Sequence, residues 1–223
     1  MSATPIRASL LLRSTPASNS WATVSCRARC TRLDNQADAI KRAVETIAKF
    51  TGKPPRSWES PGLTETEETL DLLRLNGIEY VADWVIDDLP QDIATPHGTI
   101  TTIPYSVETN DIVIHALQHL PSEQFLKRCT DQFDRLYLEG ASNARIMAIS
   151  IHPYITGVPH RIKYLEALLD YVIGHDGVAL MTASEIGDWY RAEMAKNSIA
   201  VYRRTWRPGE LRRIRYTRCC LRQ

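Results

Sequence analysis

The stretch that decides the fold reads Ile146-Met-Ala-Ile-Ser-Ile-His-Pro-Tyr154. Its first six residues give the strongest strand signal in the chain, because they are apolar apart from one serine and no charge interrupts them. Helices are predicted on both sides of this strand, over residues 122–140 and 159–174, and each ends at a glycine. A strand between two helices is typical of an α/β fold with parallel strands.

The same alternation of helix and strand continues through the middle of the chain. Further strands are predicted over 78–82, 99–105 and 178–181, and further helices over 34–50, 64–77, 109–119 and 182–196. This order implies parallel strands joined by right-handed crossovers. About four strands are convincing, whereas a closed barrel of this type needs about seven or eight. We therefore expect an α/β protein with a partial (β/α) barrel, incomplete at its N-terminal side.

The net charge of +1 is the sum of three unlike segments. The first 33 residues contain five arginines and no acid, and the last 23 contain eight arginines and one glutamate. The residues between them contain 14 basic and 25 acidic side chains. Neither basic end has the periodicity of a folded element. We therefore expect a disordered basic extension over 1–30, the barrel domain over 31–197 and a disordered basic tail over 198–223.

Composition argues against several classes of function. The chain has no apolar run near the roughly 20 residues of a membrane-spanning helix, and Leu10–Leu12 is too short for a secretory signal. We therefore expect a cytoplasmic protein without a membrane partner. The acid-free start is typical either of an organellar transit peptide or of a disordered extension. The arginine-rich tail can bind nucleic acid, but a solvated tail is the simpler explanation, so no nucleic-acid partner is expected.

Candidate catalytic residues follow two of the predicted strands. Asp83, Trp84, Asp87 and Asp88 come after one of them, and His152 comes directly after the strand quoted above. Reactive groups gather at strand ends in parallel α/β folds. A carboxylate cluster that faces a histidine can supply a general base, a general acid or part of a metal site. The structural alternatives are a buried, hydrogen-bonded histidine and loop carboxylates that cap backbone groups or face solvent.

A third polar run, Tyr105-Ser-Val-Glu-Thr-Asn-Asp111, connects a predicted strand to a predicted helix. Asn110 or Asp111 can cap that helix. His115 and His119 have the spacing of helical zinc ligands, but an alanine replaces the glutamate of the H-E-x-x-H motif, which disfavours a metal site. The motifs of dinucleotide-binding, P-loop and serine-hydrolase proteins are absent from the sequence.

Several stretches in a fixed order resemble one protein family, and the match runs from about Thr31 to Ile186: residues 51–62, 76–90, 104–111 and 151–154. They resemble the polysaccharide deacetylase family, with the nodulation-deacetylase-like fold, and especially the branch that includes the metal-independent allantoinases. The resemblance implies a distorted seven-stranded (β/α) barrel that hydrolyses a C–N bond, in an N-acetylated sugar or in a cyclic amide or ureide. In such enzymes a carboxylate activates water, often with a divalent metal, and a histidine protonates the leaving nitrogen.

The resemblance also implies roles for individual residues. His152 matches the histidine acid, and Asp87 and Asp88 are further catalytic candidates. Trp58 stands where sugar deacetylases carry an arginine, which favours the amidohydrolase-like branch. The segment from Asp83 to Asp88 is implied to line the pocket and to orient His152. The residues implied in substrate binding are Trp58, Asp83, Trp84, Tyr105, Glu108, Asn110 and Asp111.

Two motifs of the family have no counterpart in the sequence. The strand that ends in T-F-D-D, which supplies the catalytic base and a metal ligand, is not found, and residues 20–30 hold the place of a metal-binding histidine without containing one. We therefore expect no cofactor, although intact relatives can use a divalent metal. We also expect a truncated or frame-disrupted chain with impaired catalysis, whose small-molecule partner is an amide or an N-acetylated sugar.

The alternative function is a non-catalytic binding or oligomerisation module. An incomplete barrel leaves a sheet edge that can pair with a second copy of the chain. We therefore expect a homo-oligomer.

Overall fold

The computed structural model describes residues 8–12, 21–22, 30 and 34–205. The chain forms two compact units, Met1–Asp188 and Trp189–Gln223. All the described strands belong to the first unit, and the second contains the continuation of helix α5 (Ala183–Thr205). None of the described helices is long and apolar enough to cross a membrane.

One sheet of the first unit has three parallel strands in the order β7-β1-β8. β1 (Ala8–Leu12) lies between β7 (Ile146–Ile149) and β8 (Val178–Met181), and Leu10 of β1 stands opposite Leu180 of β8. No regular element was expected in residues 1–30, and β1 differs from that expectation. Residues 8–12 form a strand because their backbone N–H and C=O groups pair with those of β7 on one side and of β8 on the other.

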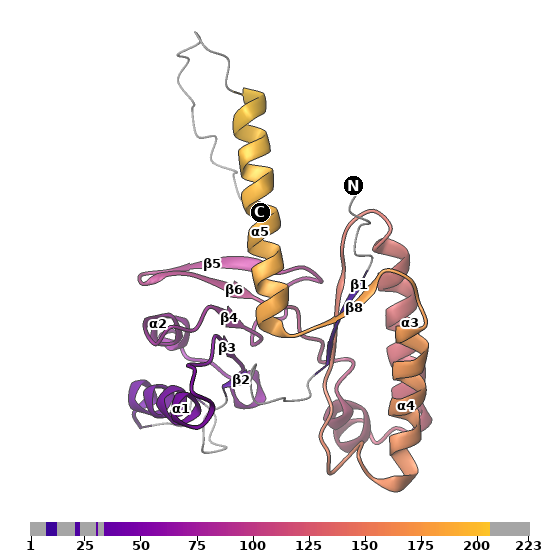
Figure 1. Cartoon of the computed structure of the whole chain (residues 1–223). Helices are drawn as coiled ribbons and strands as arrows, with labels where there is room; N and C mark the ends of the chain where they lie inside the picture. Colours follow the sequence, from indigo (N-terminus) through magenta and orange to yellow (C-terminus); the bar gives the residue numbers. More distant parts are fainter. Residues whose placement is uncertain (1–7, 13–20, 23–29, 31–33, 206–223) are drawn as a thin grey trace, which may run out of the picture. The chain divides into compact units, whose positions relative to one another are not determined.

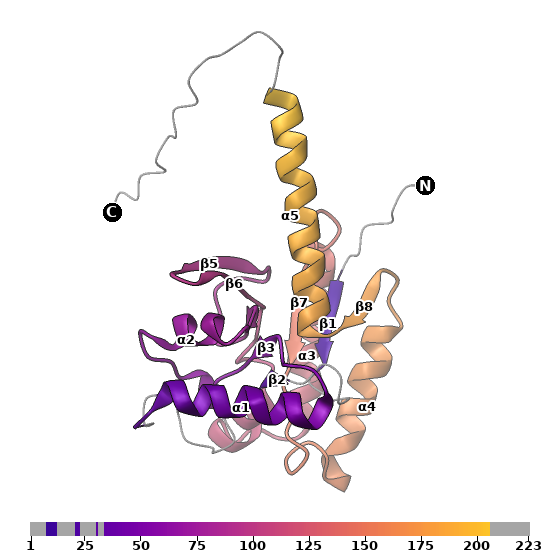
Figure 2. The same cartoon turned by 60° about the vertical axis from the view of Figure 1, so that its left-hand side comes forward.

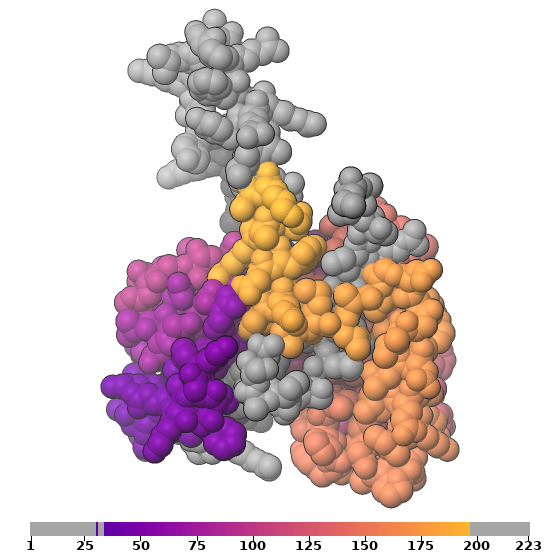
Figure 3. Space-filling model, viewed as in Figure 1, coloured from indigo at the N-terminus to yellow at the C-terminus, as the bar shows by residue number. Residues whose placement is uncertain are grey.

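Helices α3 (Glu123–Glu139) and α4 (Pro159–Ile173) pack against each other and against this sheet (Figures 1 and 2). Their buried side chains recur at intervals of three and four residues, so each helix buries one face. The outer side of α4 forms part of the surface of this unit (Figure 3, orange). The core between the helices and the sheet consists of Ile114, Phe125, Cys129, Phe133, Leu136, Met147, Ile149, Leu165, Leu168 and Val172.

The other sheet has five strands in the order β2-β3-β4-β6-β5. β2 (Trp21–Ala22), β3 (Ser57–Trp58), β4 (Tyr80–Val81) and β6 (Gly98–Thr102) are parallel. β5 (Gln91–Thr95) pairs with β6 in an antiparallel hairpin. Parallel strands that alternate with helices make the first unit a partial (β/α) barrel, as the sequence predicts.

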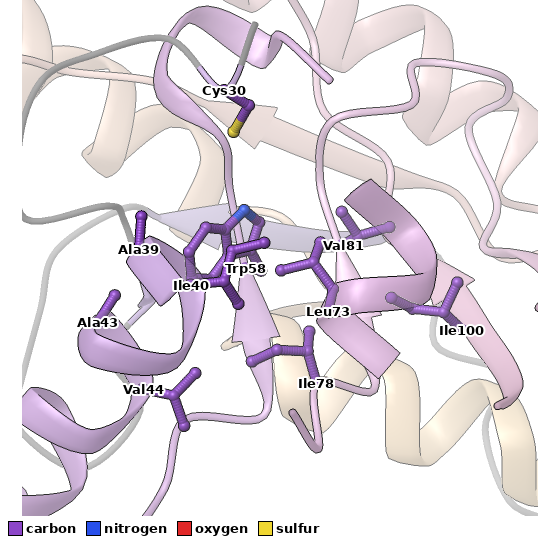
Figure 4. Packing of buried hydrophobic residues seen from close by; sticks show 10 residues of the cluster. All are labelled: Cys30, Ala39, Ile40, Ala43, Val44, Trp58, Leu73, Ile78, Val81 and Ile100. Atoms are coloured by element: carbon purple, nitrogen blue, oxygen red, sulfur yellow. The ribbon is translucent and has the colours of Figure 1, made fainter. Parts of the chain in front are cut away.

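Helices α1 (Gln36–Thr51) and α2 (Thr69–Leu75) pack against this second sheet (Figure 1). The side chain of Asn35 accepts the backbone N–H of Asp38 at the start of α1, and Gly52 ends the helix in the left-handed region with φ 78°. Figure 4 shows the apolar core between these elements, with the fully buried Trp58 near its middle. That core consists of Cys30, Ala39, Ile40, Ala43, Val44, Trp58, Leu73, Ile78, Val81 and Ile100.

A third apolar cluster contains residues from both sheets and from the first turns of α5. Gly187 of α5 lies directly against the buried ring of Tyr80, so closely that a methyl group at position 187 would overlap the ring. Asp188 then accepts the hydroxyl of Tyr80 at 2.6 Å and a guanidinium N–H of Arg56 at 2.7 Å. These contacts fix the start of α5 on β4. The cluster consists of Tyr80, Ile103, Ile146, Ala148, Ala183 and Ile186.

The predicted elements are found with some changes in their bounds. The long helices α1, α3 and α4 and the strands β7 and β8 match the expectation. α2 begins at Thr69 rather than near Thr64, because Thr64 itself is extended, with φ −98° and ψ 128°, and it follows Gly62 and Leu63, which have left-handed φ values of 66° and 54°. The strands β2, β3 and β5 were not predicted, and two of them are only two residues long.

Candidate active site

The imidazole of His152 lies against the carboxylate of Asp111. Nδ1 of His152 is 2.6 Å from Oδ1 of Asp111, and the backbone N–H of His152 donates to Oδ2 at 2.7 Å. The hydroxyl of Thr156 donates to the same Oδ2 at 2.6 Å. Asp111 is fully buried, so these three donors replace the water that its carboxylate gives up on folding.

These contacts determine which nitrogen of His152 can meet a substrate. A carboxylate only accepts hydrogen bonds, so Nδ1 carries a proton and Nε2 is left for chemistry. The imidazole is 22% exposed, which leaves part of its surface accessible. The adjacent carboxylate also stabilises the imidazolium that forms when Nε2 takes up a proton. The pair can therefore accept and return one proton at Nε2.

Asp111 reaches this position from the end of the loop that follows β6. It precedes the π-helix η3 (Ile112–Leu117), which replaces the α-helix predicted over 109–119, and its backbone N–H donates to the carbonyl of Ser150 at 3.1 Å. Asn110 caps this turn, since its side-chain oxygen accepts the N–H of Ile112 at 2.9 Å. π-Helical turns are frequent at functional sites. Asp111 was expected to bind substrate, but it is buried and holds His152 instead.

Tyr105 and Ser150 connect this site to the rest of the loop. The hydroxyl of Tyr105 donates to Oγ of Ser150 at 2.8 Å and accepts Nδ2 of Asn110 at 2.9 Å. Tyr105 is 7% exposed, so its hydroxyl holds the loop and leaves little surface for a ligand. The predicted binding residues Tyr105 and Asn110 thus lie together, and both position the backbone that carries Asp111.

Two backbone hydrogen bonds stabilise the turn after His152. The backbone N–H groups of Ile155 and Thr156 donate to the carbonyl of His152 at 2.8 and 3.0 Å. Tyr154 is 64% exposed, and its ring meets the imidazole of His152 edge-on with centroids 5.6 Å apart. The turn therefore places a fixed histidine beside an exposed aromatic ring.

A cavity of about 400 Å³, a size that suits a small organic ligand, lies beside residues 104–108, and neither His152 nor Asp111 is among its lining residues. Tyr105 lines this cavity, and its hydroxyl also donates to Ser150, whose carbonyl accepts the backbone N–H of Asp111. The predicted residues Asp87, Asp88 and Glu108 also line it, and Glu108 lies 3.5 Å from the guanidinium of Arg128. The complete lining is Val85, Ile86, Asp87, Asp88, Pro104, Tyr105, Ser106, Val107, Glu108, Gln132, Ile146 and Ala148.

The structure does not bring Asp87 and Asp88 to His152. The carbonyl of Asp88 accepts the backbone N–H of Ile146, the first residue of β7, whereas His152 follows the other end of that strand. A strand rises by about 3.3 Å per residue, so several residues of β7 separate the two places. Burial raises the pKa of Asp88, as does the nearby Asp87, while Arg145 opposes the shift. Asp88 therefore contacts the start of β7, whereas Asp111 contacts His152 beyond its end, and the catalytic role of Asp87 and Asp88 stays a prediction.

A second pair of carboxyl groups lies where β3 and β4 end. Oδ1 of Asp83 accepts the backbone N–H of Ser60 at 2.7 Å, and Oε2 of Glu65 accepts the indole N–H of Trp84 at 2.7 Å. The other two oxygens, Oε1 of Glu65 and Oδ2 of Asp83, are buried, and no group of the described residues donates to either of them. Burial is the largest cause that raises the pKa of Glu65 to about 8, and Asp83 adds to it.

No protein-family model matches the sequence. The chain is 27% identical over 177 residues to a putative polysaccharide deacetylase of Schizosaccharomyces pombe, a match that covers 72% of this chain and 55% of that protein. The crystal structure of a probable polysaccharide deacetylase from Pseudomonas aeruginosa PAO1 is 30% identical with a TM-score of 0.65, and the match covers 72% of this chain and 55% of that one. The chain is similar to these polysaccharide deacetylases.

The chain is also similar to the crystal structure of Puue Allantoinase. That match has a TM-score of 0.69 and 25% identity, and it covers 74% of this chain and 56% of the other. The chain spans 55% and 62% of the lengths of the two curated relatives that it matches. The sequence-based resemblance to deacetylases and allantoinases is confirmed.

Two tryptophans of the deacetylase-like segment have different environments. Trp58 is fully buried in the core, and its indole N–H donates to Oγ of Ser60 at 2.9 Å, so it supports the sheet and does not reach a substrate. Trp84 is 44% exposed. Trp58 therefore lies in the core and Trp84 at the surface, and their roles in substrate binding stay predictions.

The described part of the chain does not fit a divalent metal. Both carboxylate oxygens of Asp111 are used by His152 and Thr156. Within residues 30 and 34–196, no three His, Cys, Asp or Glu side chains come together in a way that could hold a metal ion.

Sequence reasoning missed Glu65 and Thr156. Thr156 follows the His152-Pro-Tyr run, and a hydroxyl four residues after a candidate histidine was the available signal. Glu65 stands in an acidic stretch, Glu65-Thr-Glu-Glu68, in which no member is distinguished by spacing. Glu65 comes next to Asp83 and Trp84 only through the three-dimensional path of the chain.

Proposed function

We propose that the chain hydrolyses a non-peptide C–N bond, in an N-acetylated sugar or in a cyclic amide or ureide, with His152 as the residue that transfers the proton. The observation that carries this proposal is the buried Asp111 carboxylate, which accepts both Nδ1–H and the backbone N–H of His152. A catalytic histidine needs a fixed ring, a defined tautomer and a partner that stabilises its charged form. The relatives, named as deacetylases and an allantoinase, support this reaction class.

The reaction balances with one histidine. Nε2 of neutral His152 accepts a proton from the attacking water, whose oxygen bonds to the carbonyl carbon. The imidazolium then returns that proton to the nitrogen as the C–N bond breaks, which yields a carboxylic acid and an amine. Asp111 holds the ring throughout and stabilises the cation, while Nδ1 keeps its own proton.

We further propose that turnover is slow. The family's carboxylate base has no counterpart in the printed sequence, and residues 20–30 offer no histidine at the second motif. A positioned general acid or base contributes about 10²- to 10⁴-fold in rate. A single histidine that has to serve as base and then as acid lacks one such contribution.

The test measures release of acetate from N,N′-diacetylchitobiose and ring opening of allantoin and succinimide. We expect slow turnover of at least one of these, lost in His152→Ala and unchanged in His97→Ala, since His97 is exposed in the hairpin turn between β5 and β6. Turnover that persists in His152→Ala would overturn the role of the histidine. Turnover at the ordinary enzyme rate of roughly 10 per second would overturn the proposed impairment.

One observation favours the alternative of a non-catalytic oligomerisation module. β5 is an end strand of the five-stranded sheet, and its Asp92 and Ala94 are exposed. An end strand presents unpaired backbone groups that can pair with a second copy. Light scattering after size-exclusion chromatography tests this. We expect a dimer or larger assembly that Ile93→Pro disrupts, and a stable monomer would exclude this alternative.

A further inference from the structure

The carboxyl groups of Glu65 and Asp83 form a pair whose remaining oxygens have no access to water. Oε1 of Glu65 and Oδ2 of Asp83 are buried from solvent, and no N–H group of the described residues donates to either of them. Each carboxyl group uses its other oxygen for a protein donor, which is Trp84 for Glu65 and Ser60 for Asp83. The two carboxyl groups interact electrostatically, and two interacting buried carboxyl groups are most stable with one proton between them, because two charged carboxylates would repel each other strongly there.

The surroundings of the pair favour this shared proton. Burial raises the pKa of both Glu65 and Asp83. The thiol of Cys30 also interacts with both carboxyl groups. This thiol is buried, and burial is the largest cause that raises its pKa. Among the described residues, no lysine, arginine or histidine contributes to the shift of either carboxyl group. The pair therefore has no cation that would stabilise a second negative charge.

The pair is connected to the cavity through Trp84. The indole of Trp84 is 44% exposed, so packing alone holds it weakly, and its N–H bond to Glu65 is the specific contact that fixes it. The next four residues, Val85 to Asp88, all line the cavity. Val85 and Ile86 are 51% and 55% exposed, so they too have little buried surface to hold them. At its far end the wall is held by the carbonyl of Asp88, which accepts the backbone N–H of Ile146 at 3.1 Å, so Asp83 and Trp84 determine the position of its start.

We propose that Glu65 is a positioning residue for the cavity: with the proton that it shares with Asp83 it holds Trp84 and the start of the wall formed by residues 85–88, and loss of that proton releases the start of the wall. Deprotonation places two negative charges side by side in a buried site, where like charges repel each other strongly. The carboxyl groups then separate, and the Trp84 anchor moves with Glu65. The start of the wall is thus held at neutral pH and loosened at alkaline pH.

The experiment compares Glu65→Gln with the wild type between pH 6 and pH 10. Glutamine keeps an oxygen for the Trp84 indole and an N–H for Asp83, but it cannot lose a proton. Glu67→Gln is the matched control, because Glu67 is exposed and lies two residues away. The readouts are tryptophan fluorescence, assigned to Trp84 with Trp84→Phe, and amide hydrogen exchange of residues 84–88.

We expect a fluorescence transition near pH 8 in the wild type and in Glu67→Gln, and none in Glu65→Gln or Trp84→Phe. At pH 9.5 the amides of 84–88 should exchange at least tenfold faster in the wild type than in Glu65→Gln, with equal rates at pH 6. A transition that persists in Glu65→Gln, or equal exchange at pH 9.5, would overturn the proposal. Asp83→Asn provides the same test if the glutamine variant is unstable, and neither readout depends on turnover.

Discussion

Replacement of Asp111 separates the two tasks that its carboxylate performs. In Asp111→Asn, the side-chain oxygen can keep both the backbone N–H of His152 and the hydroxyl of Thr156 only if it occupies the place of Oδ2. The amide N–H₂ then faces Nδ1 of His152, and two donors cannot face each other. We therefore expect the imidazole to change tautomer, so that Nδ1 accepts from the amide and the proton moves to Nε2.

The expected cost in stability follows from the same three hydrogen bonds. Asp111→Ala leaves two buried donors without a partner, the backbone N–H of His152 and the hydroxyl of Thr156, which is 2% exposed. A buried donor left unpaired costs about 1–3 kcal/mol, so the alanine variant should lose about 4 kcal/mol. The asparagine variant keeps both of these bonds and should lose about 1–2 kcal/mol, mainly because a charged acceptor becomes neutral.

Urea denaturation measures the stability change, and two-bond ¹H–¹⁵N correlation spectra of the histidine ring measure the tautomer. Asp131→Asn is the control, since Asp131 is exposed and pairs only with Lys127 on the same helix, a contact worth about 0.5 kcal/mol or less. A proton that stays on Nδ1 in Asp111→Asn would refute the proposed geometry. A loss below about 1 kcal/mol in Asp111→Ala would show that the three bonds do not form.

Three further predictions concern stability and thiol chemistry. The raised pKa of Glu65 means that the folded chain keeps a proton which the unfolded chain loses, so stability should fall as pH rises from about 4.5 to about 8, by at most about 1.4 kcal/mol per pH unit. Urea midpoints across this range should be flatter in Glu65→Gln. Gly187→Ala should gain about 1 kcal/mol of helix propensity but lose more through overlap with the buried Tyr80 ring, which gives a net loss of about 2 kcal/mol in thermal or urea unfolding. Burial raises the pKa of Cys129 to about 12, so mass-mapped labelling at pH 8 should modify this thiol only after the chain unfolds.

The long elements of the fold were predictable because each carries its own signal. In α3 the buried residues Phe125, Cys129, Phe133 and Leu136 recur at intervals of four, four and three, which only a helix places on one face. β3 and β4 have two residues each, too few to show any period, so their pairing depends on neighbours elsewhere in the chain. For that reason the sequence indicates the α/β class but does not indicate the order of the short strands.

The candidate site was predictable at His152 and less so around it. His152 follows an apolar strand, and strand ends are where reactive groups gather in such folds. Its partner Asp111 lies 41 positions earlier, and nothing in the local sequence distinguishes it from Asp87 or Asp88. Only the register of the loop against Ser150 brings Asp111 to the ring. The pairing of Glu65 with Asp83 depends in the same way on the path of the chain through the left-handed Gly62 and Leu63.

The position of β1 has a consequence for how the chain acquires its structure. Both neighbours of Ala8–Leu12 are strands that are synthesised long after it, and the sheet is complete only when Val178–Met181 has been made. Closing so long a loop costs entropy before any strand pairing compensates for it, and non-local pairing slows folding. During synthesis, β1 is therefore a strand whose partners do not yet exist, the kind of segment that chaperones bind and that otherwise aggregates. Helices α3 and α4 can form locally, so refolding should show early helix formation followed by a slower phase in which the β7-β1-β8 sheet closes.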